Sequence, residues 1–144
     1  MSALFSSARV RAHARPVLAA LIGGGAYGGW AAFTHHRLGL GVAVHAGLTQ
    51  VALSVAATLV AVLILERLFR WPSNPVHGFW LAALGTSMLG TVWLYVGHAL
   101  AGTPHIAVTI APPVIVGAVS DFLYAGALLA LAKRRAEIDE VPVR

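Results

Sequence analysis

The sequence predicts an all-α, polytopic membrane protein with four transmembrane helices that form two tandem helical hairpins. Of the 144 residues, 58% are hydrophobic and only 10% are charged, whereas a soluble domain usually has about 25% charged residues. The apolar residues gather in four runs that suit a bilayer core about 30 Å thick. Most basic residues lie at the ends of these runs, as in membrane proteins. We therefore expect the lipid bilayer to be the solvent of this chain.

The composition excludes or disfavours several classes of function. The chain has no cysteine, so disulfides, thiolate metal sites and cysteine nucleophiles are excluded. The net charge of +5 does not indicate nucleic-acid binding, because the basic residues form no patch with interleaved aromatic side chains. No nucleophile elbow, phosphate-binding loop or zinc-protease motif occurs, so no motif favours an enzyme.

The chain begins with a basic segment, residues 1–16, which carries arginines but no acidic residue. We interpret it as a cytoplasmic or interfacial segment, and an organelle transit peptide of similar composition is the alternative. The first expected span, 17–33, is short and rich in glycine. Within it, Gly24 and Gly28 form a G-x-x-x-G pair, which predicts close packing against another helix.

The second expected span, 41–65, places small and polar residues three and four positions apart, so that they share one helix face. This face includes Gly47, Gln50 and Ser54, and we expect it to contact protein while the opposite face contacts lipid. The third expected span, 78–101, has Trp and Tyr residues near its ends, as interfacial residues do. Gly90 is its expected helix-packing position.

The fourth expected span, 105–132, contains Pro112 and Pro113. Proline removes backbone hydrogen bonds, so we expect a helix kink and free carbonyl groups at this point. Gly117 is a further expected helix-packing position. Residues 133–144 are expected to form a basic cytoplasmic tail.

The distribution of basic residues predicts an orientation. In a four-span protein, nine of the ten lysine and arginine residues would lie on one side, with Arg37 alone on the other. Positively charged residues accumulate on the cytoplasmic side of membrane proteins. We therefore expect both termini to be cytoplasmic, in a bacterial inner membrane.

The two halves of the chain resemble each other. A short apolar motif is followed by Trp30 and His35 in the first half. The same order recurs 63 residues later, where a similar motif is followed by Trp93 and His98. The second and fourth runs align at an offset of 67, which differs by four because the outer turn of the second half is longer. This pattern predicts a duplicated hairpin, and transporters often bind substrates between such repeats near the membrane midplane.

A single carboxylate, Asp121, lies inside the fourth run. It precedes Lys133 by 12 residues, which places it about 18 Å into a core about 30 Å thick. Ionisable groups at such depth are expensive and usually functional. We expect Asp121 to bind a proton, a cation or a substrate, with Gln50, Ser54 and Tyr124 as candidate partners. The alternative is a structural aspartate whose hydrogen bonds hold two helices together.

Histidines gather near the expected outer side. His35, His45, His98 and His105 are weak candidates for metal binding, or for bis-histidine haem ligation with His98 and either His35 or His45 as axial ligands. Their spacing matches no dedicated ligand motif. We therefore favour polar interfacial anchors, and neither haem nor metal is the favoured cofactor.

The function expected from these features is that of a small transporter or channel-like subunit, with Asp121 for proton or cation coupling or for substrate binding. The alternative is a non-catalytic membrane anchor or assembly subunit of a larger complex, with haem ligated by the histidines as one form of it. Besides the lipid bilayer, the expected partner is a second copy or another membrane subunit. No motif identifies the substrate.

Overall fold

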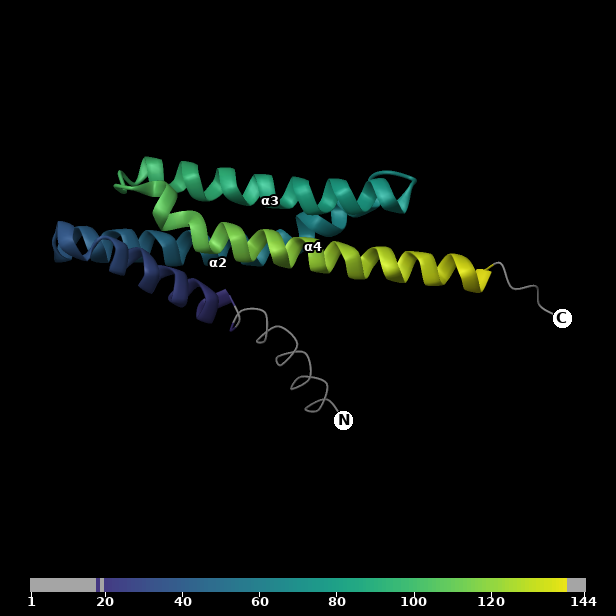
Figure 1. Cartoon of the computed structure of the whole chain (residues 1–144), viewed down its shortest axis with the longest axis horizontal. Coiled ribbons are helices and arrows are strands. Elements are labelled where there is room, and N and C mark those ends of the chain that lie inside the picture. The colour runs from purple at the N-terminus through teal and green to yellow at the C-terminus, as the bar shows by residue number, and fades with distance from the viewer. Residues whose placement is uncertain (1–17, 19, 140–144) are drawn as a thin grey trace, which may run out of the picture. The chain divides into compact units, whose positions relative to one another are not determined.

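The structure is a computed structural model that describes residue 18 and residues 20–139. Residues 1–17, residue 19 and residues 140–144 lie outside the described part, and with them the expected basic N-terminal segment and the end of the tail. The described chain is entirely helical (Figure 1). Its elements are a helix over residues 20–34, the 3-10 helix η1 (His36–Leu38), α2 (Leu40–Arg70), α3 (Pro75–Leu100) and α4 (Ile106–Asp139).

Three of these helices have the length and composition of membrane spans. In α2, α3 and α4, the apolar stretches are long enough to cross a bilayer, and they follow the second, third and fourth predicted runs. The all-helical, membrane-type architecture predicted from the composition is confirmed at this level. The helix over residues 20–34 extends about 22 Å, which is less than the hydrocarbon core. A four-span count therefore stays a prediction.

Local signals explain where α3 begins. Asn74 precedes the helix, and its side-chain oxygen accepts a hydrogen bond from the backbone N–H of Val76 at 2.8 Å. Pro75 occupies the first helical position, where no backbone donor is needed. This arrangement is a helix N-cap, which satisfies a donor that the helix itself cannot pair.

The chain divides into two compact units. The first comprises the chain up to Val60 together with Val92–Pro113, and the second comprises Ala61–Thr91 together with the chain from Val114 onward. Each of α2, α3 and α4 contributes a segment to both units.

In the first unit, the helix over residues 20–34 packs antiparallel to α2 through glycines. A Cβ atom added to Gly24 would lie 2.9 Å from Cγ2 of Val55, and one added to Gly28 would overlap Val51 and lie 2.9 Å from the backbone oxygen of Gly47. The two backbones approach so closely that no side chain fits between them. Close backbone approach is the packing that small residues allow in lipid.

The other predicted packing glycines have open surroundings. A Cβ atom added to Gly90 or Gly117 would meet no heavy atom within 4 Å. Gly90 and Gly117 therefore make no such close contact within the described part of the chain.

The two prolines lie inside α4, which continues as a helix past them. Because Pro112 has no N–H, the carbonyl of Val108 loses its usual partner four residues later. The indole N–H of Trp30 donates to this carbonyl at 3.0 Å. The carbonyl that Pro112 frees is thus used to bind the N-terminal helix.

The second unit has a small apolar core. Leu65 of α2, Ala82 and Ala83 of α3, and Ala125 of α4 are buried together. The rings of Phe79 and Phe122 pack edge to face beside them, with centroids 6.0 Å apart. Small alanines bring the three helices together and hold the polar side chains of this unit at a common interface.

Candidate functional site

Asp121 lies in the second unit and pairs with a hydroxyl group. Ser87 of α3 donates from Oγ to Oδ2 of Asp121 at 2.9 Å, and both side chains are half-buried. Within the described residues, no cationic side chain forms an ion pair with Asp121, and its Oδ1 atom has no protein hydrogen-bond partner. A neutral hydroxyl cannot cancel a negative charge, so the ionised carboxylate would be largely uncompensated here.

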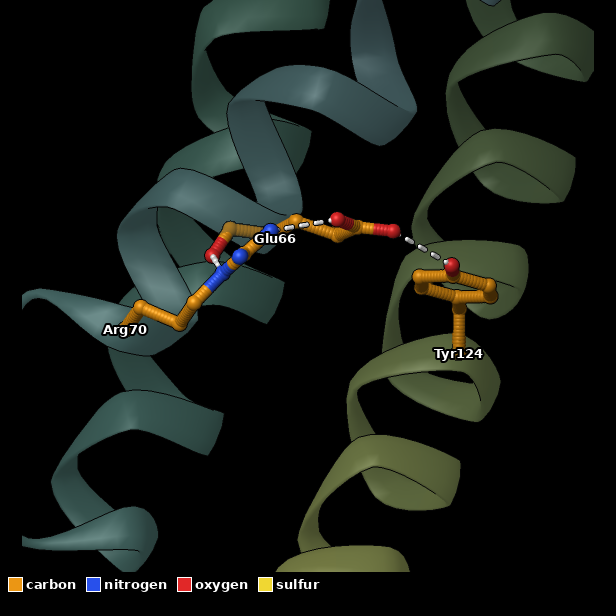
Figure 2. A network of polar contacts seen from close by, with 3 residues as sticks. All are labelled: Glu66, Arg70 and Tyr124. Atoms are coloured by element: carbon orange, nitrogen blue, oxygen red, sulfur yellow. Dashed lines mark hydrogen bonds and ion pairs between the residues drawn. The ribbon is translucent and has the colours of Figure 1, made fainter.

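Figure 2 shows a second polar cluster in the same unit. The phenol of Tyr124 on α4 donates to Oε1 of Glu66 on α2 at 3.0 Å. Arg70, one turn further along α2, approaches the other oxygen of Glu66 at 2.6 Å. The Arg70 side chain is 71% exposed, so this ion pair contributes little to stability. Tyr124 lies three positions after Asp121, which places the two polar side chains on neighbouring positions of one α4 face.

A buried chain of hydrogen bonds runs through the first unit. Gln50 donates from Nε2 to Oγ of Ser54 at 2.6 Å, and its Oε1 accepts from Nε2 of His98 at 2.7 Å. The other ring nitrogen of His98 bonds to Oγ1 of Thr103 at 2.9 Å. Gln50 and His98 have no exposed surface at all. Every polar atom of these two side chains lies within hydrogen-bond distance of a partner, as burial in an apolar medium requires.

The other histidines differ in burial. His35 is completely buried, with both ring nitrogens next to backbone carbonyl oxygens. His45 is exposed and donates from Nε2 to the carbonyl of Ala101 at 3.1 Å, and His105 is exposed as well. Surrounding elements bury the rings of His35 and His98, so these two side chains contact protein, whereas the interpretation of the histidines as interfacial anchors stays a prediction.

The surroundings of these histidines disfavour the weaker interpretation, in which they ligate a metal ion or a haem iron. Among the described residues, no group of three or more His, Asp or Glu side chains could hold a metal ion. Both ring nitrogens of His35 and of His98 already contact protein acceptors or donors. To ligate a haem iron, either ring would have to give up one of these hydrogen bonds.

The four residues predicted as one binding site fall into two groups. Gln50 and Ser54 bond to each other in the first unit, whereas Asp121 and Tyr124 belong to the second. Within that unit the partner of Asp121 is a residue the prediction missed, Ser87. A sequence signal for it exists, because it shares the small-residue face of the third run.

Comparison with protein-family models, with curated proteins and with solved structures found no match. The function therefore has to be inferred from the geometry of these polar groups.

Proposed function

We propose that this protein is a small membrane transporter or channel-like subunit in which Asp121 binds a proton or a small cation. The observation that carries this proposal is the half-buried carboxyl group in an apolar helix, paired with a neutral hydroxyl and with no cationic side chain among the residues that the structure describes. An ionised carboxylate costs several kcal/mol in such surroundings. Binding a proton or a cation removes that cost, which is what a coupling site does in each cycle.

The second cluster supplies an access route for this ion. Arg70 and Tyr124 are the exposed members, Glu66 is half-buried, and Tyr124 links Glu66 to the face of α4 that carries Asp121. Carboxylates and hydroxyl groups can pass a proton along hydrogen bonds. In this proposal, Glu66 and Tyr124 bring a proton to the face of α4 that carries Asp121, and Ser87 holds the carboxyl group in place.

The same proposal places the protein in a bacterial inner membrane, with four spans and both termini cytoplasmic. It is supported by the antiparallel packing of residues 20–34 on α2 and by the distribution of basic residues. Cysteines introduced at Arg37 and Gly102 should react with an impermeant reagent from outside, whereas tags at the termini should be protected. Reversed labelling would contradict the topology.

A duplicated hairpin is part of the proposal. Trp30 and Trp93 both donate their indole N–H to a backbone carbonyl of another helix, Val108 and Leu53 respectively. These acceptors lie 55 residues apart, not the 67 expected from aligning the second and fourth runs. The two donors therefore occupy matching positions of the repeat, whereas their two acceptors do not.

We also propose that the protein assembles with itself or with another membrane subunit. Only 6% of the apolar stretch of α4 is buried within the chain, so this helix has surface available for a second copy. Mass measurement in nanodiscs tests this proposal, since a single chain per particle would contradict self-assembly.

The decisive experiment is ion flux into proteoliposomes. With a pH gradient and a membrane potential imposed, the wild-type protein should carry protons or an added monovalent cation, and Asp121→Asn should lower that flux at least about tenfold. Ser120→Ala is the matched control, because Ser120 is an exposed neighbour whose hydroxyl bonds only to its own helix. Absence of wild-type flux, or full flux in Asp121→Asn, would contradict the proposal. Either result would favour the alternative, a membrane anchor or assembly subunit.

A further inference from the structure

Both ring nitrogens of the completely buried His35 lie against backbone carbonyl oxygens. Its Nδ1 atom lies 2.7 Å from the carbonyl oxygen of Ala31. Its Nε2 atom lies within hydrogen-bond distance of the carbonyl oxygen of Pro104. A carbonyl oxygen only accepts hydrogen bonds, so both ring nitrogens must donate. A neutral ring carries one N–H and would present a lone pair to one of the two oxygens.

We propose that His35 is a proton-binding site, held as an imidazolium ion that ties the end of the helix over residues 20–34 to the turn between α3 and α4. The ligand of this site is the proton that the ring binds. The two carbonyl groups stabilise the protonated ring by accepting a hydrogen bond from each of its N–H groups. This site is independent of the ion proposed at Asp121, with which it shares no hydrogen-bond partner.

The position of His35 favours a cation. It directly follows the last residue of the helix over residues 20–34. The last carbonyl groups of a helix have no partner within the helix and carry partial negative charge. Ala31 is one of these terminal residues, so its carbonyl oxygen can accept hydrogen bonds from side chains, here from the ring of His35 and the hydroxyl of Thr34.

A neutral alternative exists and can be tested. The hydroxyl of Thr34 lies 3.1 Å from Nδ1 of His35 and could donate to it. The same hydroxyl also lies 3.0 Å from the carbonyl oxygen of Ala31, to which it can donate. Since that oxygen is closer to Nδ1 than the hydroxyl is, the geometry points to a protonated Nδ1. In the neutral alternative, Thr34→Val would remove the donor on which Nδ1 depends.

The surrounding groups provide no acidic counter-ion. Among its described residues, the first unit contains no Asp or Glu. The nearest aromatic neighbour of the ring is His105, with centroids 6.4 Å apart. Besides His35 itself, the charged and titratable side chains in the described part of the unit are His36, Arg37, His45, His98 and His105, with the phenols Tyr27 and Tyr95. At this site, the partial negative charges of the carbonyl oxygens therefore stabilise the imidazolium ion in place of a carboxylate.

His98 provides an internal reference. Its Nε2 atom donates to Gln50, whereas its Nδ1 atom faces a hydroxyl that can donate as well as accept. A neutral ring with one N–H therefore satisfies every contact of His98. The two buried histidines should differ in proton count within one sample.

The test is the ¹⁵N NMR spectrum of the full chain, labelled at histidine, in lipid bilayers at about pH 7. Each ring nitrogen reports whether it carries a proton. We expect two N–H groups for His35 and one for His98, with the His35 signals unchanged in Thr34→Val. One unprotonated nitrogen in wild-type His35 would overturn the proposal, as would loss of a proton from Nδ1 in Thr34→Val.

Discussion

Replacing Gly28 with alanine tests the glycine contact between the helix over residues 20–34 and α2. The added Cβ atom would overlap Cγ2 of Val51 and lie 2.9 Å from the backbone oxygen of Gly47. Favourable separations between such atoms are about 3.5–4.0 Å. A valine side chain can change its rotamer, but a backbone oxygen moves only with its helix. The two helices must therefore separate by about half an ångström, and every contact along the interface weakens.

Overpacking of this kind costs about 1–3 kcal/mol. Alanine also favours a helix over glycine by up to about 1 kcal/mol, and the matched variant Gly29→Ala isolates that gain. Gly29 is the next residue, it is exposed, and nothing lies within 4 Å of its Cβ position. The difference between the two variants is thus the packing cost, which changes the ratio of folded to unfolded protein by about 5-fold to 150-fold.

The assay is reversible unfolding in mixed micelles, followed by tryptophan fluorescence. Gly28→Ala should have an unfolding free energy about 1–3 kcal/mol below that of Gly29→Ala. If the two variants agree within about 0.5 kcal/mol, which is the usual scatter of surface substitutions, the close contact at Gly28 does not exist. Antiparallel packing of residues 20–34 on α2 would then lose its main support.

Two further predictions use the same assay. Gln50→Leu leaves the buried Nε2 of His98 without an acceptor and should lower the unfolding free energy by about 1–3 kcal/mol. Thr49→Val, its neighbour, should change that free energy by less than about 0.5 kcal/mol, and equal effects would argue against the buried network. Trp30→Phe should cost about 0.5–1.5 kcal/mol through its lost hydrogen bond. That cost should shrink in a Pro112→Ala background, where the helix can pair the same carbonyl itself, and additive effects would refute this link.

Hydropathy predicted the three long helices but not their ends. The second run was expected at 41–65, whereas α2 continues to Arg70. Apolar composition shows which residues contact lipid, and a helix extends past them wherever its side chains still favour it. Glu66 and Arg70 do so here, since they pair four residues apart on the last turn of α2. The end of the helix depends on local capping and turns, which hydropathy does not report.

The glycine pair could be recognised from spacing alone, but its partner could not. The G-x-x-x-G pattern at Gly24 and Gly28 indicates a surface that allows close approach, and the structure places Gly47 and Val51 against it. Which helix approaches, and in which register, depends on how all the helices pack together. Gly90 and Gly117 lack this pair spacing, and a Cβ atom added to either would meet no heavy atom within 4 Å, so a single glycine in an apolar run does not show that another helix lies against it.

For the polar residues, too, the sequence predicts that a partner exists but does not identify it. In an apolar medium every buried polar group needs a hydrogen-bond partner, so Gln50 and Asp121 in apolar runs predict that partners exist. The partners themselves, His98 and Ser87, lie 48 and 34 residues away and on other helices. Two features of His98 were nevertheless visible in the sequence: it matches His35 in the repeat, and it ends an apolar run. The end of an apolar run is where interfacial groups are expected, but the chain that follows α3 can fold back and bury a residue there. Thr103 does this by bonding to His98, so the position of a polar residue along a span does not determine whether it meets lipid headgroups or protein.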